Sequence, residues 1–214
     1  MSHSFRSCLL SGGASRRMGR DKALLPHPEG GTWLEHSLEL LLELGEPATL
    51  ISRHHAHRLQ AEALLARRAA QGLSSPHLAV VLEPPPWEGP LRALARLMAH
   101  HPGERLLLCP VDMPWLDGAT LRALLAAAQS DPCRERILLA HDGQRLQPLL
   151  GVVSAQAGRR LRLEAALELG ERGLQRWLMG EDWAPVPLPW GPLRNINRPE
   201  DLPPSVFPSA APGS

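Results

Sequence analysis

The sequence contains few cysteines, and their spacing excludes two kinds of site. Cys8, Cys109 and Cys133 are the only cysteines in 214 residues, and no two of them form a CxxC pair. An odd number of widely spaced cysteines supports neither a disulfide framework nor a structural zinc site. We therefore expect the protein to work in a reducing compartment.

Long hydrophobic runs and an excess of charge are also missing. No apolar stretch approaches the roughly 18 residues that span a bilayer, and the start of the chain has no apolar signal segment. Lysine and arginine total 23 against 22 aspartates and glutamates, a net charge of +1. This balance creates no general attraction to nucleic acid or to an anionic membrane. We expect a cytoplasmic protein without such partners, in which any anion is bound locally.

Strand and helix patterns alternate along most of the chain, and this alternation predicts the fold. Thr32 and Glu35 have the spacing of a helix capping box. The predicted strands are 5–10, 48–52, 78–82, 105–109, 137–140 and 149–153, and the predicted helices are 32–44, 58–70, 91–101, 120–128, 159–169 and 174–179. Such alternation is typical of a three-layer αβα fold with a Rossmann-like, mainly parallel sheet. We assign residues 1–202 to one such domain and 203–214, rich in proline, serine and alanine, to a disordered tail.

A glycine-rich loop follows the first predicted strand. Residues 9–22 read LLSGGASRRMGRDK, which matches neither GxxxxGK[ST] nor GxGxxG. Gly12 and Gly13 would let backbone amides approach phosphate oxygens, because no Cβ intervenes. Arg16 and Lys22 would then neutralise the remaining charge. By themselves these residues also fit a glycine turn beside a solvated basic surface.

Asp112 lies three positions beyond the end of the apolar run 105–109. A carboxylate beyond a buried parallel strand lies at the edge where open α/β sheets bind ligands. There its oxygens could hold Mg²⁺ that bridges nucleotide phosphates. A helix cap or a turn is the alternative role for such an aspartate.

Other polar and aromatic residues allow more than one interpretation. Asn195 and Asn197 alternate, so in an extended segment both amides would project from one side, although an Asx-turn is equally open. The histidines in 54–57 lack metal-binding helical spacing, and we expect a solvated surface there. Trp87, in a proline-rich loop, is the tryptophan best placed to stack on a ligand.

Several motifs together resemble one family. LSGGASRRMGRDK is similar to the signature loop of the molybdenum cofactor guanylyltransferases and their nucleotidyltransferase relatives, approximately LxGGxSxRMGxDK. The further matches, in the family's order, are EGPL at 88–91, CPVDMP at 109–114, HDGQR at 141–145 and NINRPEDL at 195–202. The resemblance covers nearly the whole chain.

This resemblance implies a reaction and a set of site residues. The terminal phosphate of molybdopterin would attack the α-phosphorus of GTP and expel pyrophosphate. A phosphate monoester with a second pKa of about 6 is already ionised, so no serine triad is needed. The implied catalytic residues are Arg16, Lys22 and Asp112, with Asp112 as the Mg²⁺ ligand. The implied nucleotide contacts are Leu10, Ser11, Gly12, Gly13, Lys22, Ser52, Glu83 and Asp112, and the implied cofactor contacts are Asn195 and Asn197.

Departures from the family pattern keep alternatives open. Ser52 and Glu83 stand where relatives often have asparagine and aspartate, and Ala93 stands where glycine is typical. A cytidylyltransferase acting on the same cofactor, or a related transferase, is therefore an alternative. A non-catalytic module that binds or delivers the cofactor would keep the glycine loop and Lys22 but need not retain Asp112. Transient contacts with other cofactor-biosynthesis or acceptor proteins are also implied.

Overall fold

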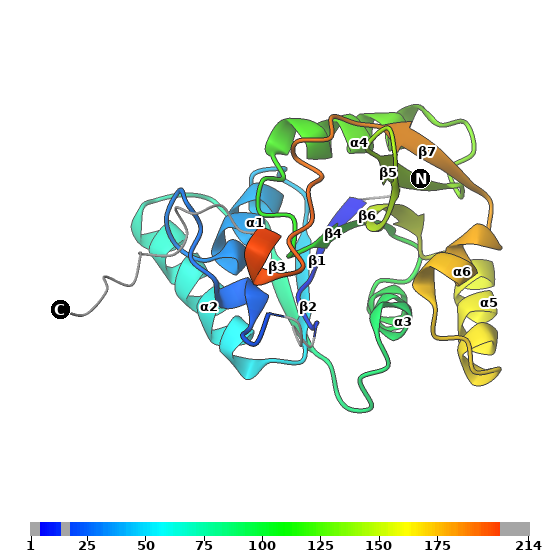
Figure 1. The fold of residues 1–214 in the computed structure, drawn as a ribbon, viewed down its shortest axis with the longest axis horizontal. Helices are drawn as coiled ribbons and strands as arrows, with labels where there is room; N and C mark the ends of the chain where they lie inside the picture. Colours follow the sequence, from blue (N-terminus) through cyan, green and yellow to red (C-terminus); the bar gives the residue numbers. More distant parts are fainter. Residues whose placement is uncertain (1–4, 14–17, 202–214) are drawn as a thin grey trace.

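The computed structural model describes residues 5–13 and 18–201 (Figure 1). Its strands are β1 Phe5–Leu10, β2 Ala48–Ser52, β3 Leu78–Leu82, β4 Arg105–Pro110, β5 Ile137–His141, β6 Leu146–Ser154 and β7 Trp183–Pro187. Its helices are η1 Lys22–Leu24, α1 Trp33–Leu42, α2 His55–Ala70, α3 Pro90–His100, α4 Gly118–Ser130, α5 Ala157–Glu168, α6 Leu174–Met179 and η2 Pro199–Asp201. Arg16 and the tail 203–214 lie outside the described residues, so their predicted roles stay predictions.

The strands form one sheet in the order β3-β2-β1-β4-β6-β5-β7. Only β6 runs against the others, since it pairs antiparallel with β4 and with β5. The prediction of a mainly parallel sheet is therefore confirmed. The sequence patterns missed β7, which contains Pro185 and Pro187. Proline cannot donate to a strand ladder but is tolerated in an edge strand, and β7 is at the edge.

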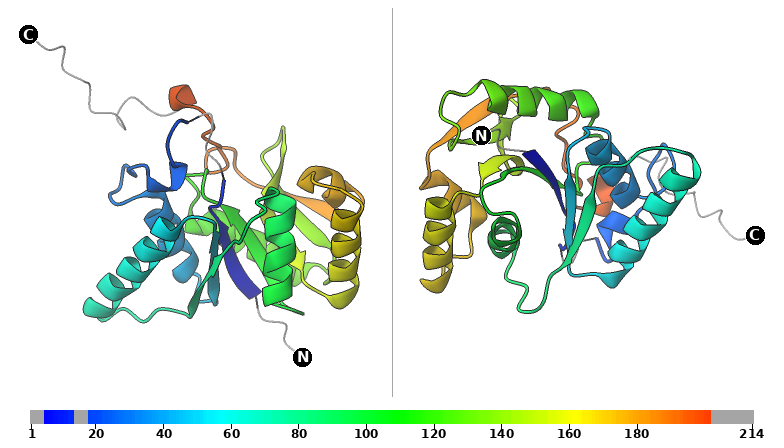
Figure 2. Two further views of the ribbon diagram at one scale, coloured as in Figure 1. Left: turned by 90° about the horizontal axis from the view of Figure 1, so that it is seen from below. Right: turned by 180° about the vertical axis from the view of Figure 1, so that it is seen from behind.

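Helices cover both faces of this sheet, as Figure 1 and Figure 2 show. Alternate residues of β4 point to opposite sides, because successive side chains of a strand do so. Leu107 packs with α1, α2 and α4, whereas Leu106 and Leu108 pack with α3, α5 and α6. Cys8 and Cys109 are buried free thiols within these two cores, and burial raises the pKa of Cys109 to about 12. The predicted three-layer arrangement is confirmed.

The helix starts differ in how well the sequence marks them. α1 has the predicted capping box: Glu35 N donates to Thr32 Oγ1 at 3.2 Å, and Thr32 N donates to Glu35 Oε2 at 2.9 Å. α2 begins at His55, three residues before the predicted start, and its cap residue His54 makes no side-chain capping bond. No capping signal marked that start. None of the described helices is both long enough and apolar enough to cross a membrane.

The ends of four strands meet at one edge of the sheet. β1 has β2 on one side and β4 on the other, so the order of strands reverses beside β1. Backbone hydrogen bonds extend the ladders one residue further, from Ser11 N to Ile51 O at 3.1 Å and from Val111 N to Leu10 O at 3.2 Å. Glu83 N donates to the carbonyl of β2's last residue at 2.8 Å. Open α/β sheets bind ligands at such a reversal.

Gly151 of β6 provides a test of the packing at the sheet centre. A Cβ at this position would collide with the Leu138 carbonyl oxygen and lie 2.8 Å from Leu139 Cδ2. We expect Gly151→Ala to lower the free energy of unfolding by about 3 kcal/mol, measured by urea denaturation, because the packed backbone must shift. At Gly191 a Cβ would meet nothing within 4 Å, so Gly191→Ala should change stability by less than about 0.5 kcal/mol. Equal stability of the two variants would contradict this packing argument.

Candidate functional site

A pocket of about 400 Å³ lies at the ends of β1 and β4. Concave sites of this size are the usual places for small ligands. The residues predicted from the sequence that line it are Leu10, Ser11, Gly12, Gly13, Lys22, Glu83, Trp87 and Asp112. Arg53, Ala93 and Leu149 line it as well. Residues from widely separated motifs therefore form one cavity.

Lys22 and Asp112 form the charged centre of this pocket. Lys22 Nζ lies 3.5 Å from Asp112 Oδ2 and donates to Ile196 O at 2.7 Å and to Asn197 Oδ1 at 2.9 Å. Lys22 is the single lysine of the whole chain. The backbone N of Ile196 also donates to Asp112 O at 2.9 Å. The C-terminal segment thus fastens the lysine beside the strand-end aspartate.

The environment of Asp112 suits a divalent cation. Burial raises the pKa of this carboxyl above its ordinary value, although the nearby Lys22 ammonium opposes that shift. The side chain still has 26% of its surface exposed, within the pocket. Mg²⁺ is commonly held by one or two carboxylates together with substrate phosphates. Asp112 offers a partly exposed carboxylate within the pocket, which fits that ligand set.

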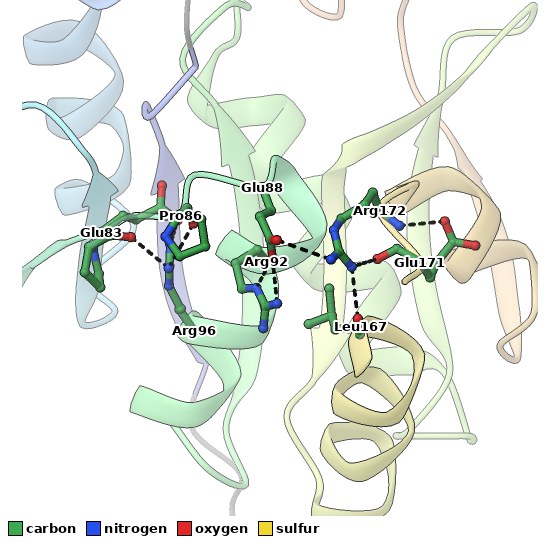
Figure 3. A network of polar contacts seen from close by, with 9 residues as sticks. Glu83, Pro86, Glu88, Arg92, Arg96, Leu167, Glu171 and Arg172 are labelled. Atoms are coloured by element: carbon green, nitrogen blue, oxygen red, sulfur yellow. Dashed lines mark hydrogen bonds and ion pairs between the residues drawn. The ribbon is translucent and has the colours of Figure 1, made fainter. Parts of the chain in front are cut away.

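Glu83 forms the wall behind the glycine loop. Its Oε1 accepts a hydrogen bond from Arg96 Nη1 at 2.7 Å, and Arg96 Nη2 also donates to Pro84 O at 2.8 Å (Figure 3). A Cβ on Gly12 would lie 2.7 Å from the other carboxylate oxygen, Oε2. Gly12 is therefore needed for this close approach. Arg96 leaves Glu83 Oε2 as a fixed hydrogen-bond acceptor at the pocket wall.

The loop between β3 and α3 is held at both ends. Glu88 accepts from Arg92 Nη2 at 2.6 Å and from Arg172 Nη2 at 3.2 Å, so α3 and the α5–α6 connection both fix it (Figure 3). The Trp87 indole donates to a backbone carbonyl of the same loop at 3.0 Å. The Arg53 guanidinium lies 5.2 Å from the Trp87 ring centroid, within cation–π range. An exposed aromatic ring thus stands at the pocket rim.

The structure corrects the expectation that the histidine cluster is solvated. His55 is exposed, but His57 is fully buried, and its Nδ1 lies 2.8 Å from Ser52 Oγ. Ser52 is also buried and does not line the pocket, where Arg53 lies instead. The reason is that His57 falls on the inward face of α2. A signal was present in the sequence: the helix buries positions 57, 61, 64 and 68, which recur at helical spacing.

The two C-terminal asparagines have different partners. Asn195 Nδ2 donates to Gln147 Oε1 at 2.9 Å, whereas Asn197 Oδ1 accepts from Lys22. Gln147 Nε2 in turn donates to Asp142 Oδ2 at 3.0 Å, which joins the HDGQR turn to this segment. Neither asparagine lines the pocket itself. The turn that follows is fastened by a carboxylate, since Asp201 Oδ2 accepts from Asn197 N at 3.0 Å.

A second group consists of residue types that can bind a metal, but its geometry is unsuitable for this. His27, Glu29 and His36 have ligand atoms within 4.8 Å of one another. However, His27 Nε2 is bonded to Pro114 O at 2.8 Å, and its Nδ1 accepts from Glu29 N at 3.2 Å. The two imidazole rings stack at 3.7 Å, so their in-plane lone pairs do not converge. We assign this group a packing role.

Gly12 allows a test of the pocket wall. We expect Gly12→Ala to weaken the binding of GTP, the nucleotide implied by the sequence resemblance, about tenfold, because its methyl group must displace the Glu83 carboxylate that Arg96 holds. Binding is measured by calorimetry, and the unfolding free energy of the nucleotide-free variant is measured in parallel. A Cβ on Gly13 meets nothing within 4 Å, so Gly13→Ala is the matched control for stability. Unchanged GTP affinity in Gly12→Ala would contradict the described wall.

Fold and site together define a class of enzyme. An open α/β sheet carries a glycine loop, a lysine and a strand-end aspartate at its switch point, which is the arrangement of an NTP transferase. The chain belongs to the MobA-like NTP transferase domain family, whose sequence pattern matches residues 7–185.

Individual relatives agree with this membership. The chain is 34% identical to a probable molybdenum cofactor guanylyltransferase of Rhodopirellula baltica, over 92% of this chain and 89% of that protein. It is 33% identical to a molybdenum cofactor guanylyltransferase of Pseudomonas syringae, over 84% of this chain and 80% of that protein. The solved structure of molybdopterin-guanine dinucleotide biosynthesis protein A from Archaeoglobus fulgidus shares the fold, with a TM-score of 0.64 and 20% identity over 92% of this chain and 94% of that chain.

Proposed function

We propose that this protein transfers GMP from GTP to the terminal phosphate of molybdopterin, releasing pyrophosphate and forming the guanine dinucleotide cofactor. The observation that carries the proposal is the Lys22–Asp112 pair behind the glycine loop, in a chain that aligns over nearly its whole length with guanylyltransferases. A binding module that only delivered the cofactor would not need Asp112. This chain has both the glycine loop with Lys22 and the strand-end Asp112, which supports an enzyme.

The residues of the pocket suit the charge that nucleotidyl transfer must stabilise. Backbone amides at Gly12 and Gly13 can face phosphate oxygens, and the Lys22 ammonium can neutralise charge on the reacting phosphate. Asp112 would hold Mg²⁺, which supplies further neutralisation of the phosphate oxygens and the leaving pyrophosphate. Arg16 belongs to the same proposal as a second cation, although it lies outside the described residues. Orientation and charge then provide the catalysis, without an enzyme nucleophile.

The pocket wall offers contacts to a nucleotide base. Guanine presents neighbouring N–H donors on its Watson–Crick edge, whereas cytosine presents an amino group beside acceptors. Glu83 Oε2 is a fixed acceptor, because Arg96 occupies the other oxygen. Trp87 offers a ring on which a base can stack. A single acceptor oxygen can bind an N–H donor of either base, so we propose GTP because the relatives are guanylyltransferases. Ser52, which the family resemblance placed at the nucleotide, does not line the pocket.

The second substrate fits the side of the site where the C-terminal segment lies. Asn197 contacts Lys22, and Asn195 lies two residues before it. The Arg194 guanidinium lies 4.8 Å from the Trp115 ring centroid and 5.1 Å from that of Trp190. A guanidinium near two tryptophan rings offers a positive charge to a phosphate and apolar surface to a heterocycle, and molybdopterin contains both groups. A cytoplasmic location and transient contacts with other cofactor-handling proteins remain part of this proposal.

A pyrophosphate-release assay tests the proposal. Purified protein is incubated with Mg²⁺, molybdopterin and either GTP, CTP or ATP, and the product is identified by mass. We expect release with GTP only, dependent on molybdopterin and abolished by a chelator. Release with CTP would instead support the cytidylyltransferase. Nucleotide binding without any release would support the delivery module.

A further inference from the structure

A buried histidine links three segments that border the pocket. His57 lies in the first turn of α2 and has 0% of its surface exposed. Its Nδ1 lies 2.8 Å from both Ser11 Oγ and Ser52 Oγ, and its Nε2 lies 2.8 Å from Asp21 Oδ2. These partners come from the end of β1, the end of β2 and the residue before η1. The histidine itself does not line the pocket, so its role must be exerted through these neighbours.

Asp21 connects His57 with Lys22. One carboxylate oxygen of Asp21 faces His57, and the other accepts from Ala23 N at 3.0 Å, which caps η1. A capping carboxylate fixes how a helix leaves its loop, and Lys22 is the first residue of η1. Burial acts to raise the pKa of Asp21, but hydrogen bonds from His57 and Ala23 outweigh it and lower the pKa below its ordinary value. Asp21 therefore stays an ionised acceptor.

The donors and acceptors around His57 decide which serine is bound. Because an ionised Asp21 only accepts, Nε2 of the imidazole carries the hydrogen that faces it. In the tautomer with its hydrogen on Nε2, Nδ1 offers one lone pair to two hydroxyl groups at equal distance. Ser52 Oγ accepts from His54 N at 3.0 Å, which leaves its own hydrogen directed to Nδ1. The hydroxyl hydrogen of Ser11, which lines the pocket, is then available to a ligand.

We propose that His57 is a positioning residue for the transfer reaction. Through Asp21 it holds Lys22 beside Asp112, and by bonding Ser52 it leaves Ser11 to donate to a phosphate oxygen of the nucleotide. This inference rests on the proposed function, since it assigns these residues to a bound nucleotide. Serine, histidine and aspartate also form nucleophilic triads, but there one serine has the histidine nitrogen to itself. Here two serines share it.

Two substitutions of His57 distinguish the role of Nε2, which faces Asp21, from the role of Nδ1, which faces the two serines. A glutamine amide reaches the place of Nε2 and keeps the donor to Asp21, whereas an asparagine amide reaches the place of Nδ1 and keeps the contact with Ser52. We expect His57→Asn to lower kcat about 50-fold with little change in the GTP Kd, because Lys22 is displaced. We expect His57→Gln to keep kcat and the GTP Kd close to wild type, because Lys22 stays in place and no Nδ1 acceptor competes with the nucleotide for the Ser11 hydroxyl.

Nitrogen-15 NMR of the lysine side chain provides a measurement independent of activity. The chain has a single lysine, so protein grown on lysine labelled at Nζ gives one side-chain ammonium resonance. We expect this resonance to shift in His57→Asn and to keep its wild-type position in His57→Gln. His55→Asn, the same change at an exposed position of the same helix turn, is the matched control and should keep wild-type kcat, Kd and resonance.

A further variant keeps the test decisive if replacement of the buried histidine prevents folding. Ser52→Ala leaves His57 in place but frees its Nδ1 for Ser11. GTP binding should then weaken about fivefold, although Ser52 is outside the pocket, with the Lys22 resonance unmoved. Unchanged GTP affinity in Ser52→Ala would overturn the role of His57 toward Ser11.

The outcomes also separate this inference from the proposed function. If wild-type protein transfers no nucleotide but the Lys22 resonance moves in His57→Asn alone, the positioning of Lys22 stands and the proposed function fails. If wild-type protein transfers GMP and the resonance is the same in both His57 variants, the positioning role is wrong. Equal losses of stability in both variants with unaltered kcat and Kd would also overturn it.

Discussion

Asp112→Asn is expected to lower the rate of GMP transfer about 10³-fold without unfolding the protein. Asparagine keeps the shape of the side chain but removes the charge that faces Lys22 and that would hold Mg²⁺. We expect the Mg²⁺ concentration for half-maximal activity to rise as well, because a neutral amide oxygen is a weaker ligand for this cation. Pyrophosphate release across a Mg²⁺ titration measures both effects.

The matched control for this change is Asp182→Asn. Asp182 has 58% of its side chain exposed and pairs with Arg136 at the surface. Exposed pairs contribute little to stability, so this variant should retain wild-type turnover and Mg²⁺ dependence. Wild-type turnover in Asp112→Asn at ordinary Mg²⁺ concentrations would show that the metal assignment is wrong.

Lys22→Met is expected to lower transfer by about 10²-fold to 10³-fold. Methionine keeps much of the apolar stem but removes the ammonium that bonds Ile196 O and Asn197 Oδ1 and faces Asp112. The loss should appear mainly in kcat, because negative charge moves onto the equatorial oxygens and the leaving pyrophosphate in the transition state. Arg58→Met, at a residue with half its side chain exposed, removes a positive charge elsewhere and should leave kcat unchanged.

The same variant should also alter the pH dependence of the remaining activity. Burial raises the pKa of Asp112, and Lys22 partly offsets that rise. Without the ammonium the pKa moves further up, so the carboxylate becomes protonated at a higher pH than in the wild type. We expect the acid limb of the residual kcat profile to shift to higher pH. A limb at the wild-type position would mean that Asp112 does not control it.

Sequence patterns were most informative where the structural cause is local. The capping box of Thr32 and Glu35 identified α1, because its donors and acceptors lie within one turn. The alternation of apolar runs predicted the layered sheet, because each strand must bury both faces between helices. Asp112 was predicted at the ligand-binding edge because it lies two residues beyond the end of a buried strand.

Predictions from the sequence were incomplete where distant contacts decide the outcome. The apolar pattern of β6 is compatible with either direction, and only its pairing with β4 and β5 makes it antiparallel. His57 was expected at the surface, but it lies on the inward face of α2. There its ring contacts Ser11, Ser52 and Asp21. Ser52 was expected at the nucleotide, but its hydroxyl faces inward to His57.

The chain by itself determined the order of strands and helices, the glycine loop and the presence of a carboxylate at the fourth strand's end. These follow from side-chain periodicity and from the conformations open to individual residues. Only the tertiary structure decided which polar groups meet. Lys22 contacts Asn197, 175 positions away in the chain, and His57 joins the ends of β1 and β2 to Asp21. Such contacts depend on the packing of whole helices against an open sheet, which no local pattern encodes.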